Sequence, residues 1–226
     1  MAAKPRPDLF TSIHKALRLM LYELAADMQR ADFTQSEQEA EIITRLNLCM
    51  ELLEEHGVHE DKSIFPAVQV MEPGTLRMLT IDHEQLGNVA SAVSESIESL
   101  RIASITEKPQ AGAALLRLFN TLVAAQLGHM NREEETALPA TWKYLSDEQI
   151  VGIRTRIQTG QSPERYRIWL RMMMRALSDG ELSGMYAGAK LSAPPAVVEL
   201  IDGVASEELS AARYQAIIAQ AAVIHT

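Results

Sequence analysis

Apolar residues recur at three- and four-residue steps through four long stretches of the chain. This spacing places the apolar side chains on one face of an α-helix. The predicted helices cover approximately residues 9–30, 42–65, 73–100 and 111–137. Pro66 is predicted to end or kink the second helix, and Pro139 is predicted to end the fourth. Four long amphipathic helices joined by short linkers predict an all-α protein with an antiparallel up-down four-helix bundle.

The pattern changes near Ser146, where Asp147 and Glu148 are typical of a helix start and a polar break follows before Pro163. Shorter helical stretches are expected at about residues 166–177, 180–189, 194–203 and 207–224. We therefore predict two domains: a bundle at residues 8–145 and a C-terminal helical extension at residues 146–226. The only histidine of this extension is His225, next to the end of the sequence.

Composition and charge restrict the function classes. Aromatic residues make up 5% of the chain, and the abundance of Ala, Leu, Met, Glu and Arg favours helix over sheet. A formal net charge of −9 argues against binding to nucleic acid or to an anionic membrane surface. No signal-peptide core and no apolar run of membrane-spanning length is apparent, so we expect a cytoplasmic protein. Cys49 is the only cysteine, which excludes an internal disulfide and a thiolate-rich metal site.

One motif occurs twice in the chain. His56 is followed by Glu60 and then by Pro66-Ala67, and His129 is followed at the same spacing by Glu133 and then by Pro139-Ala140. Residues four apart lie one above the other on a helix, so each copy directs an imidazole and a carboxylate toward one point. Two facing helices would then offer two histidines and two glutamates to a shared metal centre.

A further histidine precedes each copy of this motif, on the preceding predicted helix. His14 stands before the first copy and His83 before the second. Any one of these histidines alone would be predicted to be a hydrogen-bonded residue of the core. Burying all six polar groups without partners would cost several kcal/mol, roughly 1–3 kcal/mol for each group, and a metal ion offsets this cost. The candidate metal ligands are His14, His56, Glu60, His83, His129 and Glu133, with His59 as a weaker candidate.

These residues give the chain a resemblance to the hemerythrin-like family, the His-His-Glu cation-binding four-helix bundles, over about residues 8–145. The matching segments are His14-Lys-Ala-Leu-Arg18, His56-x-x-x-Glu60 with Phe65-Pro66, Asp82-His83-Glu84, and His129-x-x-x-Glu133 with Leu138-Pro139. The resemblance implies that the four histidines are terminal ligands and that Glu60 and Glu133 bridge two irons. Iron is therefore the expected cofactor, although manganese or zinc would suit the same nitrogen and oxygen donors.

Two departures from the family's oxygen carriers affect the expected function. Those carriers have a further histidine where this chain has Gly87, and they place a bridging aspartate five residues after the histidine of the fourth helix. A centre with fewer histidines leaves more open positions for reaction. We therefore expect a non-haem di-iron protein that binds, senses or reduces a small oxidant, such as oxygen, nitric oxide or hydrogen peroxide, in oxidative or nitrosative stress.

Other interpretations of the sequence stay open. The protein could be an iron-dependent regulatory or interaction module, in which residues 146–226 form a homodimer or bind a protein partner. It could instead supply iron to other proteins or repair their iron centres. Whether it is an enzyme is also open. If it is one, the expected activity is that of a di-iron oxidoreductase of the peroxidase, oxidase or nitric oxide reductase type. Glu55, Glu84, Glu134 and Glu135 are the carboxylates considered for orienting the imidazoles.

Overall fold

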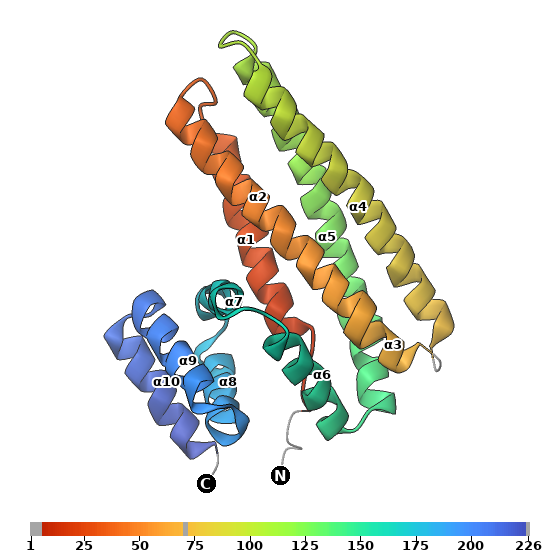
Figure 1. The fold of residues 1–226 in the computed structure, drawn as a ribbon, viewed down its shortest axis with the longest axis vertical. Coiled ribbons are helices and arrows are strands. Elements are labelled where there is room, and N and C mark those ends of the chain that lie inside the picture. The colour runs from red at the N-terminus through yellow and green to blue at the C-terminus, as the bar shows by residue number, and fades with distance from the viewer. Residues whose placement is uncertain (1–5, 70–71, 225–226) are drawn as a thin grey trace. The chain divides into compact units, whose positions relative to one another are not determined.

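The computed structural model describes residues 6–69 and 72–224, and α-helices form most of this part of the chain. The expected all-helical fold with a helical bundle is confirmed (Figure 1). The elements of the bundle region are α1 (Thr11–Arg30), α2 (Ser36–His59), η1 (Glu60–Ile64), α3 (Phe65–Val68), α4 (Pro73–Ile102) and α5 (Lys108–Tyr144). The later helices are α6 (Asp147–Thr159), α7 (Pro163–Ala176), α8 (Asp179–Ser192), α9 (Pro195–Glu208) and α10 (Ala211–Val223).

The chain folds into two compact units. The first consists of Met1–Phe10 and Met20–Ile153, and the second of Thr11–Leu19 and Arg154–Thr226. Helix α1 therefore contributes its first half to the second unit and its second half to the first. The units divide between Ile153 and Arg154, later in the chain than the boundary predicted at residues 145 and 146, which stays a prediction.

The first unit is a bundle of long helices around an aliphatic interior. Helix α4 packs along α5, and α2 packs against α4 (Figure 1). Ion pairs join other helices at the surface: Arg45 of α2 lies 2.8 Å from Asp27 of α1, and Lys108 of α5 lies 2.5 Å from Glu39 of α2. Buried apolar residues of this interior include Leu21, Leu24, Met28, Leu46, Leu52, Leu79, Val93, Ile97, Leu115, Phe119 and Leu122.

The two proline-containing motifs have different local structures. Helix α2 ends at His59, and the backbone widens into the π-helical turn η1 before α3 begins at Phe65. Pro66 accounts for this change, because a proline has no N–H and its ring crowds the carbonyl four residues earlier. Pro139, in contrast, lies inside α5, which continues to Tyr144. The prediction that Pro139 ends the fourth helix was therefore wrong, while the predicted break near Pro66 is present.

Helix α5 also corrects an expectation about membrane spans. Its length and hydropathy would suit a membrane-crossing helix, so the expectation that no apolar stretch approaches this length was wrong. The core helices of globular proteins pass the same test of length and composition. In this bundle α5 buries apolar side chains such as Phe119 and Leu122 together with the polar side chains of His129 and Glu133.

The loop between α1 and α2 packs closely on α5 through one glycine. Phe33 of this loop is buried, and its ring covers Gly112 so tightly that a Cβ there would lie 2.2 Å from the phenyl Cδ2. We therefore expect Gly112→Ala to lower the free energy of unfolding by about 1–3 kcal/mol, although alanine is the better helix former. Urea unfolding followed by circular dichroism would measure the change. Gly128→Ala on the same helix is the control, because its Cβ would meet only the Arg132 guanidinium at 3.5 Å.

The later helices begin at a regular interval that the sequence analysis missed. Residues 146, 162, 178, 194 and 210 each stand directly before a helix, at successive steps of 16 residues. The position is serine in every case except Pro194, and a serine hydroxyl there accepts a backbone N–H and so caps the helix. Ser178 with Glu181 forms a complete capping box. The chain after residue 145 is therefore a series of helical repeats of equal length.

The second unit has its own apolar core. Helix α7 packs on α9, and α8 packs on both α9 and α10. Two polar contacts fix these helices: Tyr214 donates a 2.6 Å hydrogen bond to Asp202, and the buried Ser183 hydroxyl lies 3.2 Å from the carbonyl of Ile217. The core is formed by Leu170, Met174, Leu177, Leu182, Tyr186, Ala187, Ile201, Val204, Ala205, Leu209, Ile217 and Ala221.

Candidate metal centre

Histidine and glutamate side chains from three parts of the first unit converge inside the bundle. His56 comes from the last turn of α2 and Glu60 from the first position of η1. His83 comes from α4, and His129 with Glu133 from α5. Glu60, His83, His129 and Glu133 each offer a nitrogen or oxygen atom, and these four atoms lie within 4.8 Å of one another. His56 offers a nitrogen within the same distance of Glu60 and Glu133.

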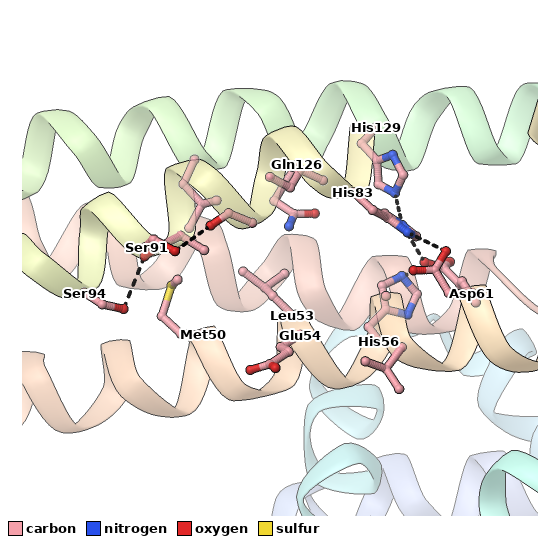
Figure 2. A pocket seen from close by; sticks show the side chains of 17 residues that line it. Met50, Leu53, Glu54, His56, Asp61, His83, Ser91, Ser94, Gln126 and His129 are labelled. Carbon is pink, nitrogen blue, oxygen red and sulfur yellow. Dashed lines mark hydrogen bonds and ion pairs between the residues drawn. The ribbon is translucent and has the colours of Figure 1, made fainter. Parts of the chain in front are cut away.

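The individual distances show that the donor atoms face each other. The Nε2 atoms of His83 and His129 are 2.9 Å apart (Figure 2). His56 Nε2 lies 3.1 Å from Glu60 Oε1, and His129 Nε2 lies 3.2 Å from Glu133 Oε1. His83 Nε2 reaches both carboxylates, at 3.4 Å from Glu60 Oε2 and 3.9 Å from Glu133 Oε1. Both copies of the repeated motif therefore direct their imidazole and carboxylate as predicted.

The cluster is buried, which makes its electrostatics strong. Glu60 and Glu133 have no exposed surface, and His129 is 1% exposed. Burial disfavours the protonated form of His83, but its hydrogen bond with Glu60 and the charges of Glu60, Asp61 and Glu133 outweigh burial and raise the pKa of His83 to about 9. Protons and a metal ion therefore compete for His83, because only the neutral imidazole is a ligand.

Two aspartates contact the outer nitrogens of the imidazoles. Asp61 Oδ1 lies 3.0 Å from His83 Nδ1, and Asp82 Oδ2 lies 3.5 Å from His129 Nδ1. Asp82 is in turn fixed by Arg132, whose Nε donates a 2.8 Å hydrogen bond to it. An Nδ1–H that faces a carboxylate leaves Nε2 as the lone-pair nitrogen. Asp61 therefore favours the tautomer of His83 that directs a free lone pair into the cluster, while Asp82 faces the Nδ1 of His129 without a hydrogen bond.

The two aspartates follow from packing between helices. Asp61 comes from η1 and contacts a histidine of α4, while Asp82 comes from α4 and contacts a histidine of α5. The sequence analysis considered only glutamates next to the ligands for this role and so missed both aspartates. Phe65 adds an apolar contact, because its ring stacks on the His83 imidazole with ring centroids 5.5 Å apart.

Asp61→Ala is expected to lower the affinity for a bound metal ion by about 10–100-fold, because His83 would lose the partner that fixes its tautomer and orientation. Competition with a chromophoric chelator would measure this affinity. Glu84→Ala is the matched control, since Glu84 is an exposed neighbour of His83 on α4. A larger loss in Glu84→Ala than in Asp61→Ala would contradict the assignment.

Comparison with protein families gives a match to the bundle region. The hemerythrin HHE cation-binding domain matches residues 7–141, which is more than half of the chain. The chain belongs to the hemerythrin HHE cation-binding family. No curated protein and no solved structure matched this hemerythrin-family chain. The resemblance seen in the sequence is thus confirmed, and with it the expectation of a cation-binding protein.

The donor set of this hemerythrin-family protein fits a metal ion of the iron, manganese or zinc type. Imidazole nitrogens and carboxylate oxygens suit these metals. Two ligands about 2.1 Å from one metal and at right angles to each other are about 3.0 Å apart, close to several donor separations in the cluster. The thiol of Cys49 takes no part, because burial raises its pKa to about 12 and so keeps it protonated.

The remaining histidines have different positions. His14 is fully buried on α1, but its segment belongs to the second unit, so its role as a ligand stays a prediction. His59 is partly buried, and burial lowers its pKa. Among the described residues, His59 belongs to no cluster of close metal donors. His225 lies outside the described residues.

Proposed function

We propose that this hemerythrin-family protein binds two iron ions and uses them to bind, sense or reduce a small oxidant such as oxygen, nitric oxide or hydrogen peroxide. The observation that carries the proposal is the buried cluster of facing His and Glu donors inside the bundle. Two iron ions would supply electrons for reduction of the oxidant. The proposed ligands are His14, His56, Glu60, His83, His129 and Glu133, with manganese or zinc as the alternative metals.

The residues of the bundle have separate tasks in this proposal. Glu60 and Glu133 would supply two negative charges that partly offset the charge of two iron cations, and each lies beside the histidine of its own motif. Asp61 holds a proton on the outer nitrogen of His83 and so fixes the plane of that imidazole, while the charge of Asp82 faces the outer nitrogen of His129. Phe65 and the buried leucines around the donors exclude water, which strengthens each electrostatic interaction.

The site is also open on one side, which favours reactivity over reversible carriage. His83 is only partly buried, and Gly87 lies exposed one helical turn after it. A Cβ at Gly87 would meet no atom within 4 Å, so no side chain covers this approach to His83. A further ligand of the oxygen-carrier type is thus absent from the position, which leaves room for an external molecule beside the donors.

Metal analysis and rapid mixing would test this proposal. Protein purified without oxygen and loaded with ferrous iron should hold about two irons per chain, and adding peroxide, oxygen or nitric oxide should change its absorption spectrum. Turnover with an added reductant would support an enzyme, while a spectral change without turnover would support a sensor. An iron content near zero after loading, or no spectral response to any of the three oxidants, would refute the proposal.

The second unit favours a second function, in which metal occupancy regulates a protein contact. Helices α7 to α10 have an apolar core of their own and carry none of the metal donors found in the first unit. We propose that this unit binds a partner protein or a second copy of the chain. Sedimentation of the iron-loaded and metal-free protein would test self-association, and an unchanged mass in both states would rule out a metal-controlled dimer.

A further inference from the structure

A cleft of about 440 Å³ leads along the bundle to the metal donors. Figure 2 shows that its walls come from α2 and α4, with side chains of α5 between them. It runs along α4 from His83 to Ser94, which corresponds to about 16 Å at the rise of an α-helix. His56, Glu60, His83 and His129 line its inner end. A volume of this size is typical of sites for small organic molecules and exceeds what a diatomic gas needs.

The floor and walls of the cleft are mainly apolar. Leu53, Leu86 and Leu122 are buried beneath it, and Met50 lines the end far from the donors. Ser91 and Ser94 add little polarity, because their hydroxyls donate hydrogen bonds to carbonyls of their own helix at 3.0 and 3.2 Å. Most of the cleft therefore offers contact to a hydrocarbon chain or ring.

One uncharged polar side chain faces the cleft close to the donors. Gln126 of α5 lies one helical turn before His129 and is only 7% exposed, and its amide points into the cleft in Figure 2. This side-chain amide forms no hydrogen bond with another of the described residues. The side-chain amide of Gln126 offers the cleft both a donor and an acceptor, so it is suited to a hydrogen bond with a ligand.

The charge of the lining disfavours an anionic ligand. Glu54 and Asp61 lie at the cleft, and no lysine or arginine is among the described residues that line it. A ligand carboxylate would therefore meet like charges, and the imidazole of His83 already faces the carboxylates of Glu60 and Asp61. Glu54 and Asp61 are exposed to solvent, so water already satisfies them. The buried carboxylate of Glu60 already faces the imidazoles of His56 and His83, so a ligand cation would gain little.

We propose that this cleft binds a neutral organic molecule with an elongated apolar body and one hydroxyl-type polar end, which hydrogen-bonds to Gln126 beside the metal donors. Such a molecule would be the substrate or the regulator of the proposed di-iron centre, so its chemical role rests on the proposed function. The binding itself needs no redox reaction and can be measured separately.

Calorimetric titration of the full-length protein with 1-octanol, octanoate and octylammonium would test the ligand class. We expect saturable binding of 1-octanol and binding of both charged probes that is at least about tenfold weaker. Tighter binding of either charged probe, or no saturable binding of 1-octanol, would overturn the proposal. If 1-octanol binds but no oxidant reacts, the proposed function fails and the cleft assignment stands. If oxidants react but 1-octanol does not bind, the cleft assignment fails and the proposed function stands.

Variants locate the binding in the cleft. Gly87→Leu should weaken 1-octanol binding at least about tenfold, because the side chain would enter the open space beside Gly87. Gln126→Leu should weaken it about fivefold through loss of the hydrogen bond. Gly74→Leu is the matched control, since Gly74 is an exposed position of α4 outside the cleft with no atom near its Cβ. Unchanged binding in Gly87→Leu, with the melting temperature retained, would place the ligand elsewhere and refute the proposal.

Discussion

Replacing Glu133 with alanine is expected to remove the proposed binuclear centre. Glu133 is fully buried, and its Oε1 lies 3.2 Å from the Nε2 of His129 and 3.9 Å from that of His83. It is one of two carboxylates within the cluster of the first unit. A water molecule that took the place of this carboxylate as a ligand would not supply its negative charge. We expect the iron content to fall from about two per chain to one or fewer, with loss of the absorption of the paired irons. Elemental analysis with absorption spectroscopy would measure both.

Glu135→Ala is the matched control for this experiment. Glu135 lies on the same helix, two residues after Glu133, but is exposed to solvent. Its removal takes away the same charge and side-chain volume without touching the buried donors, so the iron content should stay at the wild-type value. Two irons retained in Glu133→Ala would show that Glu133 is not a shared ligand, and an equal loss in both variants would point to a general charge effect.

The sequence was sufficient for the parts of the site that lie within one helix. A four-residue step places His129 and Glu133 on one face of α5 whatever surrounds them, so this half of the cluster follows from helix geometry alone. The parts that depend on contacts between helices did not follow. The contact from Asp61 to His83 depends on the register of η1 against α4, and spacing along the chain does not determine that register.

The same limit explains the error at Pro139. Identical motif positions predict identical effects, yet Pro66 follows a π-helical turn and Pro139 lies within a continuous helix. The energy of accommodating a proline depends on whether neighbouring groups can satisfy the freed carbonyl, and the local sequence does not contain this information. The 16-residue interval of Ser162, Ser178 and Ser210, in contrast, was present in the sequence. It was missed because each break was considered alone and Pro194 interrupts the serine pattern.

Removing the metal is expected to destabilise the wild-type protein, while Glu133→Met should stabilise the metal-free protein and abolish the response to metal. A ligand at a thousandfold excess over its dissociation constant stabilises the folded state by about 4 kcal/mol, so chelation should lower the melting temperature by about 10 °C. Without a metal, the buried carboxylate of Glu133 is a cost to folding. Methionine has a similar volume and no charge, so metal-free Glu133→Met should be more stable than metal-free wild type by about 1–3 kcal/mol.

Thermal melting followed by circular dichroism, with and without iron under anaerobic conditions, would measure all four states. Glu135→Met provides the control, because an exposed substitution should change stability by no more than about 0.5 kcal/mol and should preserve the response to iron. If metal-free Glu133→Met melts below metal-free wild type, then Glu133 contributes to the fold through its contacts with His83 and His129 and not through a metal. A higher melting temperature in metal-free Glu133→Met, together with loss of the iron response, would show that Glu133 lowers the stability of the metal-free bundle and serves as a metal ligand.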